Sequence, residues 1–238
     1  MKSPLALAVV AAAVIGLVGY GMTRSGADYR YRLDVAIDTP QGLKVGSSVI
    51  AVAFRWQTAI PQSGMRYDVV GDAVPVDLSD GTRIYVLLNS AGYLIRKAYA
   101  KKFPMRKTDY ENEDPALPEV EQLRAIERCQ CPAPIEYDHK NEVANWSYPL
   151  IVWLPDSRKL DSMVRLDPTN FSRDLGPGYA LRSITVSMTD QNVTYDDRQP
   201  QFRSGKGGFI DSDPGPGTRL PSVEQRQLFG YFRERVYR

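Results

Sequence analysis

The sequence predicts a mainly β protein with an antiparallel, sandwich-like or barrel-like sheet core. A helical and loop-rich insertion would interrupt this core, with a transmembrane helix before it and an amphipathic helix after it. Two observations support this fold class. Apolar residues recur at every second position in several segments joined by turn sequences, and the uncharged run Pro4–Met22 precedes them. We expect a membrane segment over 1–24, a β-rich domain over 25–198 with its insertion at about 90–147, a connector over 199–221 and a helix over 222–238.

The N-terminal run is long enough to cross a membrane. As a helix with a rise of about 1.5 Å per residue, Pro4–Met22 would measure about 28 Å, close to the roughly 30 Å hydrocarbon core of a bilayer. A cleaved signal peptide is the alternative. The run is, however, longer than the apolar region of such peptides, which usually has roughly 7 to 15 residues. The length therefore favours a retained anchor.

Small residues recur at four-residue intervals within this predicted helix, at Ala8, Ala12 and Gly16. They would form a smooth stripe along one face, where a second transmembrane helix could approach closely. Ala-rich export segments also produce this spacing by chance.

The charges around the run give two opposing predictions of orientation. Lys2 precedes it, whereas Arg24, Arg30 and Arg32 follow it, so the positive-inside rule would place the body in the cytoplasm. A short basic lead before an apolar segment is, however, the ordinary form of an export signal. We predict a single-pass inner-membrane protein whose body faces the periplasm, with export after cleavage or a cytoplasmic body as alternatives.

Composition argues against a polyanionic partner. Lys and Arg total 30 and Asp and Glu total 28, so no net field would attract nucleic acid. The apolar content of 43% is typical of a globular domain. No nucleic-acid partner, cofactor or metal is predicted.

The only two cysteines, Cys129 and Cys131, are separated by one residue. Two ordinary thiols or one local disulfide is the simplest interpretation, and a redox role is the alternative. His139 is the only histidine, and two cysteines with one histidine make an incomplete zinc set.

Two successive hairpins are predicted in the first third of the domain. Tyr29–Asp38 alternates apolar and charged residues, the turn at residues 39–42 follows, and Leu43–Trp56 would return inside the sheet. A third strand is expected over Tyr67–Leu78, and Arg83–Leu88 would return after a type I′ turn at residues 80 and 81.

The insertion is predicted to contain two short helices, one within Ser90–Phe103 and one over Pro118–Arg128. Its basic residues are expected to form a solvated face balanced by the acidic residues of segment 109–114. They are Arg96, Lys97, Lys101, Lys102, Arg106 and Lys107. Strands resume at Tyr148–Leu154, Met163–Leu166 and Ala180–Met188.

Six segments carry a resemblance to known sequences: Tyr31–Val35, Asp38–Pro40, Gly46–Val49, Val164–Phe171, Leu175–Gly178 and Leu181–Val186. They resemble a family of unknown function from alphaproteobacteria, whose members are membrane-anchored or exported. The resemblance implies bacterial origin and an N-terminal membrane or export segment, and it implies no catalytic residue.

The C-terminal region divides into a Gly/Pro-rich connector and a predicted amphipathic helix. Phe229, Phe232 and Val236 would lie on the apolar face of that helix, together with Leu228. This face could pack on the sheet, or it could bind a partner or the membrane surface.

These features predict a membrane-anchored, envelope-facing protein that binds or scaffolds another envelope or membrane protein. The alternative is a hydrolase that uses carboxylates, because Asp and Glu are plentiful and only one histidine could act as a base. A weaker alternative is a thiol redox protein that uses Cys129 and Cys131.

Overall fold

A computed structural model describes residues 26–58, 63–109, 116–137, 148–156, 162–195 and 233–234. The predicted membrane segment, the connector and His139 lie outside these residues, and so do Ala8, Ala12, Gly16, Phe229, Phe232 and Val236. Within the described part of the chain, no helix is both long and apolar enough to span a bilayer.

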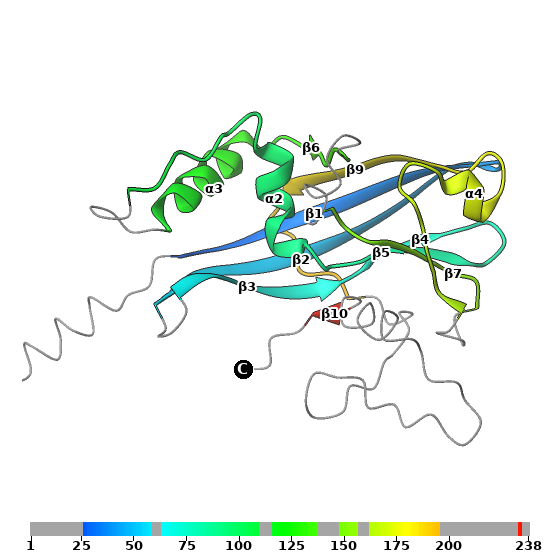
Figure 1. The fold of residues 1–238 in the computed structure, drawn as a ribbon, viewed down its shortest axis with the longest axis horizontal. Helices are drawn as coiled ribbons and strands as arrows, with labels where there is room; N and C mark the ends of the chain where they lie inside the picture. Colours follow the sequence, from blue (N-terminus) through cyan, green and yellow to red (C-terminus); the bar gives the residue numbers. More distant parts are fainter. Residues whose placement is uncertain are drawn as a thin grey trace, which may run out of the picture.

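In the described residues, the domain consists of two antiparallel sheets and three helices (Figure 1). The first sheet has the order β10-β3-β2-β1-β9-β6 and the second has the order β4-β5-β7-β8. The strands of the two sheets are β1 (Gly26–Thr39), β2 (Gly42–Thr58), β3 (Ser63–Asp72), β4 (Val74–Asp77), β5 (Arg83–Val86), β6 (Ala133–Pro134), β7 (Ile151–Leu154), β8 (Val164–Arg165), β9 (Ala180–Met188) and β10 (Arg233–Glu234). The helices are α2 (Ala91–Tyr99), α3 (Leu117–Cys129) and α4 (Phe171–Leu175). Among the described strands, neither sheet closes on itself, so the mainly β, antiparallel prediction is confirmed and the barrel-like alternative is wrong.

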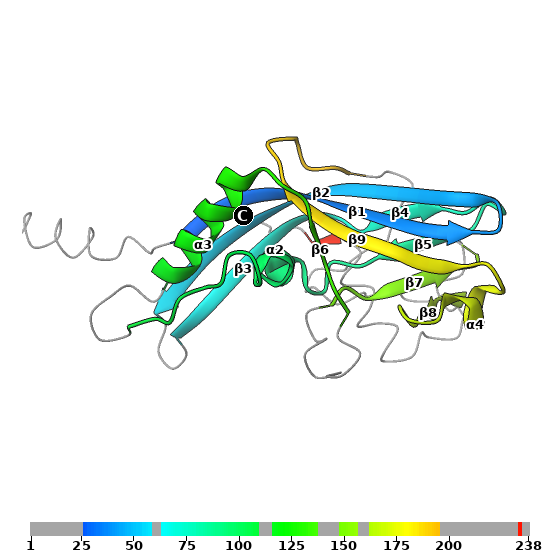
Figure 2. The ribbon, with the colours of Figure 1, turned by 90° about the horizontal axis from the view of Figure 1, so that it is seen from above.

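One face of the first sheet, its inner face, carries the main core. Alternation along β1 places Tyr31, Leu33, Val35 and Ile37 on this face, and all four are fully buried. The second sheet covers the half that contains the β1–β2 turn, while α2 and α3 lie at the half where β1 begins (Figures 1 and 2). The core is therefore continuous from the second sheet to the helices.

The predicted strand over Tyr67–Leu78 is divided between the two sheets. It breaks at Ala73, so β3 belongs to the first sheet and β4 to the second. The chain crosses inward through Gly71, which has a φ of 154°. The buried Ser48 hydroxyl then donates to the Asp72 carbonyl over 2.9 Å, and this bond fixes the crossing.

The hairpin between β4 and β5 is confirmed, but its turn is not type I′. Among the described residues of this turn only Gly81 has a positive φ, 84°, whereas type I′ needs two such residues. The Gly81 amide donates to the Leu78 carbonyl over 3.1 Å, and the Leu78 amide donates to the Thr82 carbonyl. This pattern is a three-residue loop with glycine at the left-handed position.

The insertion supplies part of the first sheet as well as two helices. Helices α2 and α3 match the predicted segments, and β6 pairs with β9 through Ala133 and Val186. Its basic residues pair with acidic residues of α3 and of the segment after β6, in the ion pairs Arg96–Glu119, Arg106–Glu121 and Lys101–Glu136. The predicted balance by segment 109–114 stays a prediction, because residues 110–114 lie outside the described chain.

The described C-terminal residues form a strand. Arg233 pairs with Asp72 and Glu234 with Gly71, so β10 extends the first sheet beside β3. The helix predicted over 222–238 is therefore wrong at these two residues, because their backbone pairs with a sheet edge.

Candidate functional site

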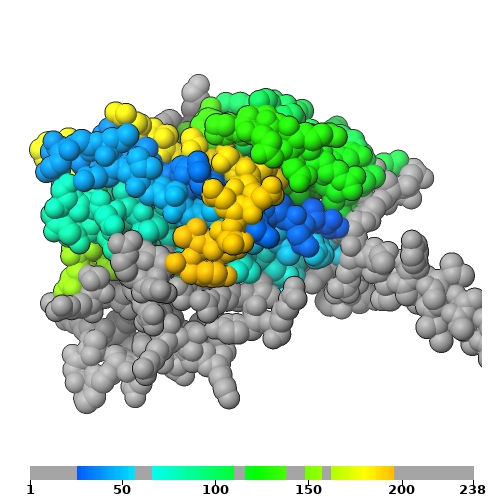
Figure 3. Space-filling model, turned by 180° about the vertical axis from the view of Figure 1, so that it is seen from behind, coloured from blue at the N-terminus to red at the C-terminus, as the bar shows by residue number. Residues whose placement is uncertain are grey.

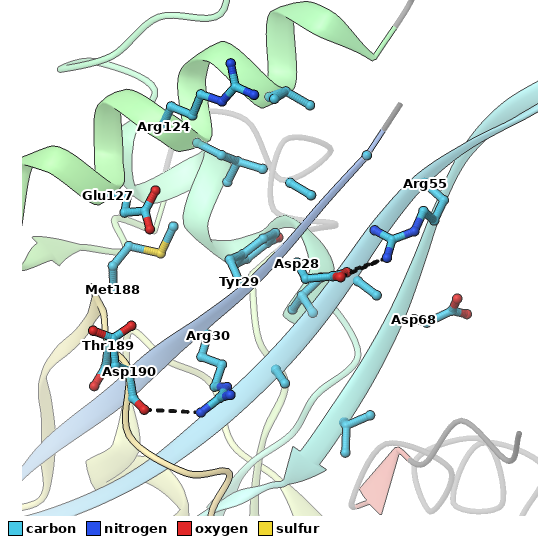
Figure 4. A pocket seen from close by; sticks show the side chains of 18 of the residues that line it. Asp28, Tyr29, Arg30, Arg55, Asp68, Arg124, Glu127, Met188, Thr189 and Asp190 are labelled. Atoms are coloured by element: carbon cyan, nitrogen blue, oxygen red, sulfur yellow. Dashed lines mark hydrogen bonds and ion pairs between the residues drawn. The ribbon is translucent and has the colours of Figure 1, made fainter. Parts of the chain in front are cut away.

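A hollow of about 800 Å³ lies beside the first half of β1 (Figure 4). It exists because β9 is shorter than β1. Strands β1 and β9 pair from Asp38 back to Tyr31, which lies opposite Met188. Met188 is the last residue of β9, and the chain leaves the sheet after it. Residues Gly26–Tyr29 consequently have β2 on one side and no strand of the described chain on the other. We call this the open edge of β1.

The chain after β9 turns across the outer face of the sheet instead of filling the open edge. Residues 189–195, the crossing segment, lie over β1 and β2 as the orange band in Figure 3. The Thr189 amide donates to the Arg30 carbonyl over 3.1 Å. At the far end, the Thr194 amide donates to the Val49 carbonyl, and the Val49 amide donates to the Thr194 hydroxyl, both over 3.1 Å.

Arg30 holds the start of the crossing segment in place. Its Nη1 donates to the carbonyl oxygens of Asp190 and Gln191, each over 3.1 Å. These two bonds keep residues 190 and 191 on the outer face, and Figure 4 shows Arg30 and Asp190 together among the residues that line the hollow. The open edge therefore stays clear of this segment.

Helix α3 forms the wall of the hollow opposite β1. Its sequence begins with proline at the second position and Glu119 in the first turn, both favourable at a helix start. Val120 and Leu123 give this wall an apolar base, and Arg124 and Glu127 are exposed above it. The wall is thus apolar near the core and charged near the solvent.

The charges around the hollow are mixed. Asp28 and Arg55 pair across β1 and β2 with a shortest distance of 2.7 Å, and Asp68 pairs with Arg66. Within the described residues, no ion pair involves Arg124 or Glu127. The helix wall therefore presents one positive and one negative group that can pair with a bound molecule.

A buried ionic cluster fixes α3 against α2 and the sheet. The Tyr67 hydroxyl donates to both Glu119 carboxylate oxygens, over 2.8 and 3.0 Å. Arg96 Nη1 lies 2.8 Å from the Tyr67 hydroxyl and 3.1 Å from Glu119 Oε2. We call these three residues the buried cluster. Two further hydroxyls, of Tyr29 and Tyr31, donate to carbonyls at the start of α2.

Burial controls the protonation of the buried cluster. It raises the pKa of Glu119, because charge is costly away from water, and the nearby Arg96 only partly offsets this effect. Burial and the negative charge of Glu119 also raise the pKa of Tyr67, which keeps its hydroxyl protonated as a donor. Glu119 is only 1% exposed, so a substrate cannot reach it. The cluster positions the wall of the hollow.

Cys129 and Cys131 form a disulfide at the C-terminal end of α3. Gln130 between them adopts a left-handed conformation with a φ of 49°, and it lines the hollow. Both cysteines are partly exposed. The Lys102 ammonium lies 3.3 Å from Cys129 Sγ and 3.1 Å from Cys131 Sγ.

Within the described ranges, no group of three or more His, Cys, Asp or Glu side chains could hold a metal ion. The predicted cysteine pair flanks Gln130, which lines the hollow, whereas the other predicted site residues lie outside the described chain. Sequence reasoning missed the hollow itself. The alternation of single strands could not reveal it, because alternation does not say which residues of two strands lie opposite each other.

Comparison with known proteins gives no assignment. No family model, no curated protein and no solved structure matches this chain.

Proposed function

We propose that this protein is a membrane-anchored, envelope-facing binding protein whose hollow holds part of another membrane protein. The observation that carries this proposal is the position of the hollow. It begins at Gly26, and only three residues separate Gly26 from the end of the predicted span at Met22.

This short connection keeps the hollow near the bilayer. A fully extended chain advances at most about 3.6 Å per residue, so the four steps from Met22 to Gly26 cover no more than about 14 Å. A partner with its own membrane segment would therefore present its juxtamembrane residues at the height of the hollow. A partner arriving from bulk solvent would have to reach a surface close to the lipid headgroups.

The periplasmic orientation is part of the same proposal. The Cys129–Cys131 disulfide supports it, because disulfides persist in oxidising compartments such as the bacterial periplasm. A cytoplasmic body would face a reducing environment.

The proposal is tested by reversing the charges of the helix wall. The full-length chain with Arg124→Glu and Glu127→Arg is purified from its native membranes next to the wild type, and associated proteins are compared. We expect the reversed wall to lose a partner that the wild type retains. A matched control reverses the exposed pair Arg106 and Glu121, which includes a residue of the same helix. Equal loss in both variants, or equal retention, would contradict a role for the hollow.

Thiol–disulfide exchange is the second candidate function, and Lys102 is the observation that favours it. A thiolate of a partner dithiol would attack one sulfur of the Cys129–Cys131 disulfide, and the other sulfur would leave as a thiolate next to the Lys102 ammonium. The second thiol of the partner would then release the mixed disulfide. The partner ends oxidised to a disulfide, and Cys129 and Cys131 end as two thiols.

The carboxylate hydrolase stays a prediction with less support. Among the described carboxyl groups, Glu119 has a raised pKa, and it is enclosed by Tyr67 and Arg96 rather than exposed to a cleft. Its geometry suits a structural role.

A further inference from the structure

We propose that the bound segment is an extended polypeptide that pairs with the open edge of β1 as an additional strand. This inference rests on the proposed function and specifies how the hollow recognises its partner. It commits to one occupant, the extended juxtamembrane segment of another membrane protein. The closeness of Gly26 to the predicted span favours this occupant, because the juxtamembrane segments of other membrane proteins are held at that height.

The direction of the backbone groups follows from one hydrogen bond. The Arg30 carbonyl accepts from the Thr189 amide on the β9 side of β1. Backbone groups in a strand alternate between its two edges with a period of two residues, so Gly26 and Asp28 also direct their N–H and C=O groups towards the hollow. Among the described residues, none pairs with these four groups.

Unpaired backbone groups on a sheet edge are a template for another chain. The first four residues of β1, Gly26–Tyr29, precede the residues of β1 that bond to β9 and to Thr189. At about 3.3 Å per residue, they would pair with about 13 Å of extended chain. The added strand would continue the line of β9, from the point where the crossing segment leaves the sheet.

The surroundings predict the side chains of the added strand. Residues facing inward would contact the ring of Tyr29, which is partly buried, and the side chain of Leu123, which is buried. Residues facing outward would lie near Asp28, Arg30 and Asp190, which are charged and exposed. We therefore expect a segment in which apolar and polar residues alternate.

Helix α3 makes the site selective for a single chain. It lies opposite the open edge as the other wall of the hollow, so an added strand would have β1 on one side and α3 on the other (Figure 4). The edge of a second folded sheet would need space for its own neighbouring strand, which α3 occupies. This arrangement favours an extended segment over a second copy of the domain.

The test uses the full-length chain in detergent micelles and a displayed library of random heptapeptides as the probe. We expect the library to yield peptides with alternating apolar and polar residues. Amide-resolved hydrogen exchange should then show slower exchange at Asp28 when such a peptide binds, with Ala27 and Tyr29 unchanged, because their amides already face β2.

Two variants provide an independent readout. Asp28→Pro removes the amide that faces the hollow and should weaken binding about tenfold, the value of one backbone hydrogen bond. Asp28→Ala removes the same side chain and its exposed pair with Arg55 but keeps the amide, so the difference in affinity between the two variants reports the amide alone. We expect Asp28→Ala to bind more tightly than Asp28→Pro.

Several results would overturn the inference. These are failure to select any peptide, binding without slower exchange at Asp28, and equal binding by Asp28→Pro and Asp28→Ala.

An Asp28 amide that is already protected without peptide would show that the chain itself fills the edge, and protection that rises with protein concentration would show a second copy. If reversing Arg124 and Glu127 abolishes a native association that Asp28→Pro leaves intact, strand addition fails while the proposed function stands.

Discussion

Arg96 Nη1 lies 3.1 Å from Glu119 Oε2, and this ion pair joins α2 to α3 beneath the wall of the hollow. Glu119 is almost completely buried, whereas the Arg96 side chain is 21% exposed. The Tyr67 hydroxyl bridges the two groups from β3. Three segments far apart in the sequence are thus fixed to one another by a single polar cluster.

Removing the cation from this cluster should destabilise the fold more than removing the anion. Arg96→Met leaves the buried Glu119 carboxyl without its cation, and we expect a loss of about 3 kcal/mol in the free energy of unfolding. Glu119→Gln keeps the shape and an acceptor for Tyr67, so its loss should be smaller, about 1 to 2 kcal/mol. Urea denaturation of the full-length chain in detergent micelles measures both values. The reverse order would contradict this role of Arg96.

Stability should also depend on pH through Glu119. Burial raises the pKa of this carboxyl in the folded state, so the folded state binds its proton more tightly than the unfolded state does. The contribution of Glu119 to stability is therefore greatest at low pH and is lost as pH rises through the folded-state pKa. Lowering the pH from 7 to 4.5 should increase the unfolding free energy of the wild type relative to Glu119→Gln. A constant or falling difference would contradict the direction of the shift.

The contact between the two sheets should not tolerate a side chain at Gly46. A Cβ atom there would lie 2.0 Å from the Pro75 carbonyl oxygen, and backbone on both sides would have to move. We expect Gly46→Ala to reduce the free energy of unfolding by about 1 to 3 kcal/mol. The neighbouring Ser47 is exposed on the outer face, so Ser47→Ala should change it by less than about 0.5 kcal/mol. Equal effects would show that the sheets are not in close contact at this position.

Lys102 should control the reactivity of the reduced cysteine pair. Its ammonium favours the thiolate form of both sulfurs, so Lys102→Gln should slow alkylation by iodoacetamide at pH 7 about three- to tenfold. Lys101→Gln is the matched control, because Lys101 pairs with Glu136 instead. Unchanged rates in Lys102→Gln would remove the main support for thiol–disulfide exchange.

The strands were predictable where one face is buried along a whole segment. Ala180–Met188 has the predicted bounds, and β7 divides as its alternation predicts, with Ile151 in the main core and Val152 in a second cluster. Local patterns did not predict that Tyr67–Leu78 would change sheets, because the crossing at Gly71 depends on where the second sheet packs. They also predicted a type I′ turn between β4 and β5, where the chain forms a three-residue loop instead.

The candidate site was beyond sequence reasoning for a related reason. The hollow arises from register, since β9 ends opposite Tyr31 while β1 starts at Gly26. Register is set by tertiary packing as well as by alternation. The buried cluster likewise joins β3, α2 and α3, and Arg96 was indistinguishable in sequence from its solvated neighbours. Only the cysteine pair could be named in advance.

Photo-crosslinking in native membranes tests the central claim most directly. A photoreactive amino acid is placed at Glu127, on the wall of the hollow, or at Leu43, which is 49% exposed at the far end of the sheet. If the hollow binds another membrane protein, irradiation should give a discrete crosslinked species at position 127 and none at position 43. The same products from both positions, or no product from position 127, would contradict it.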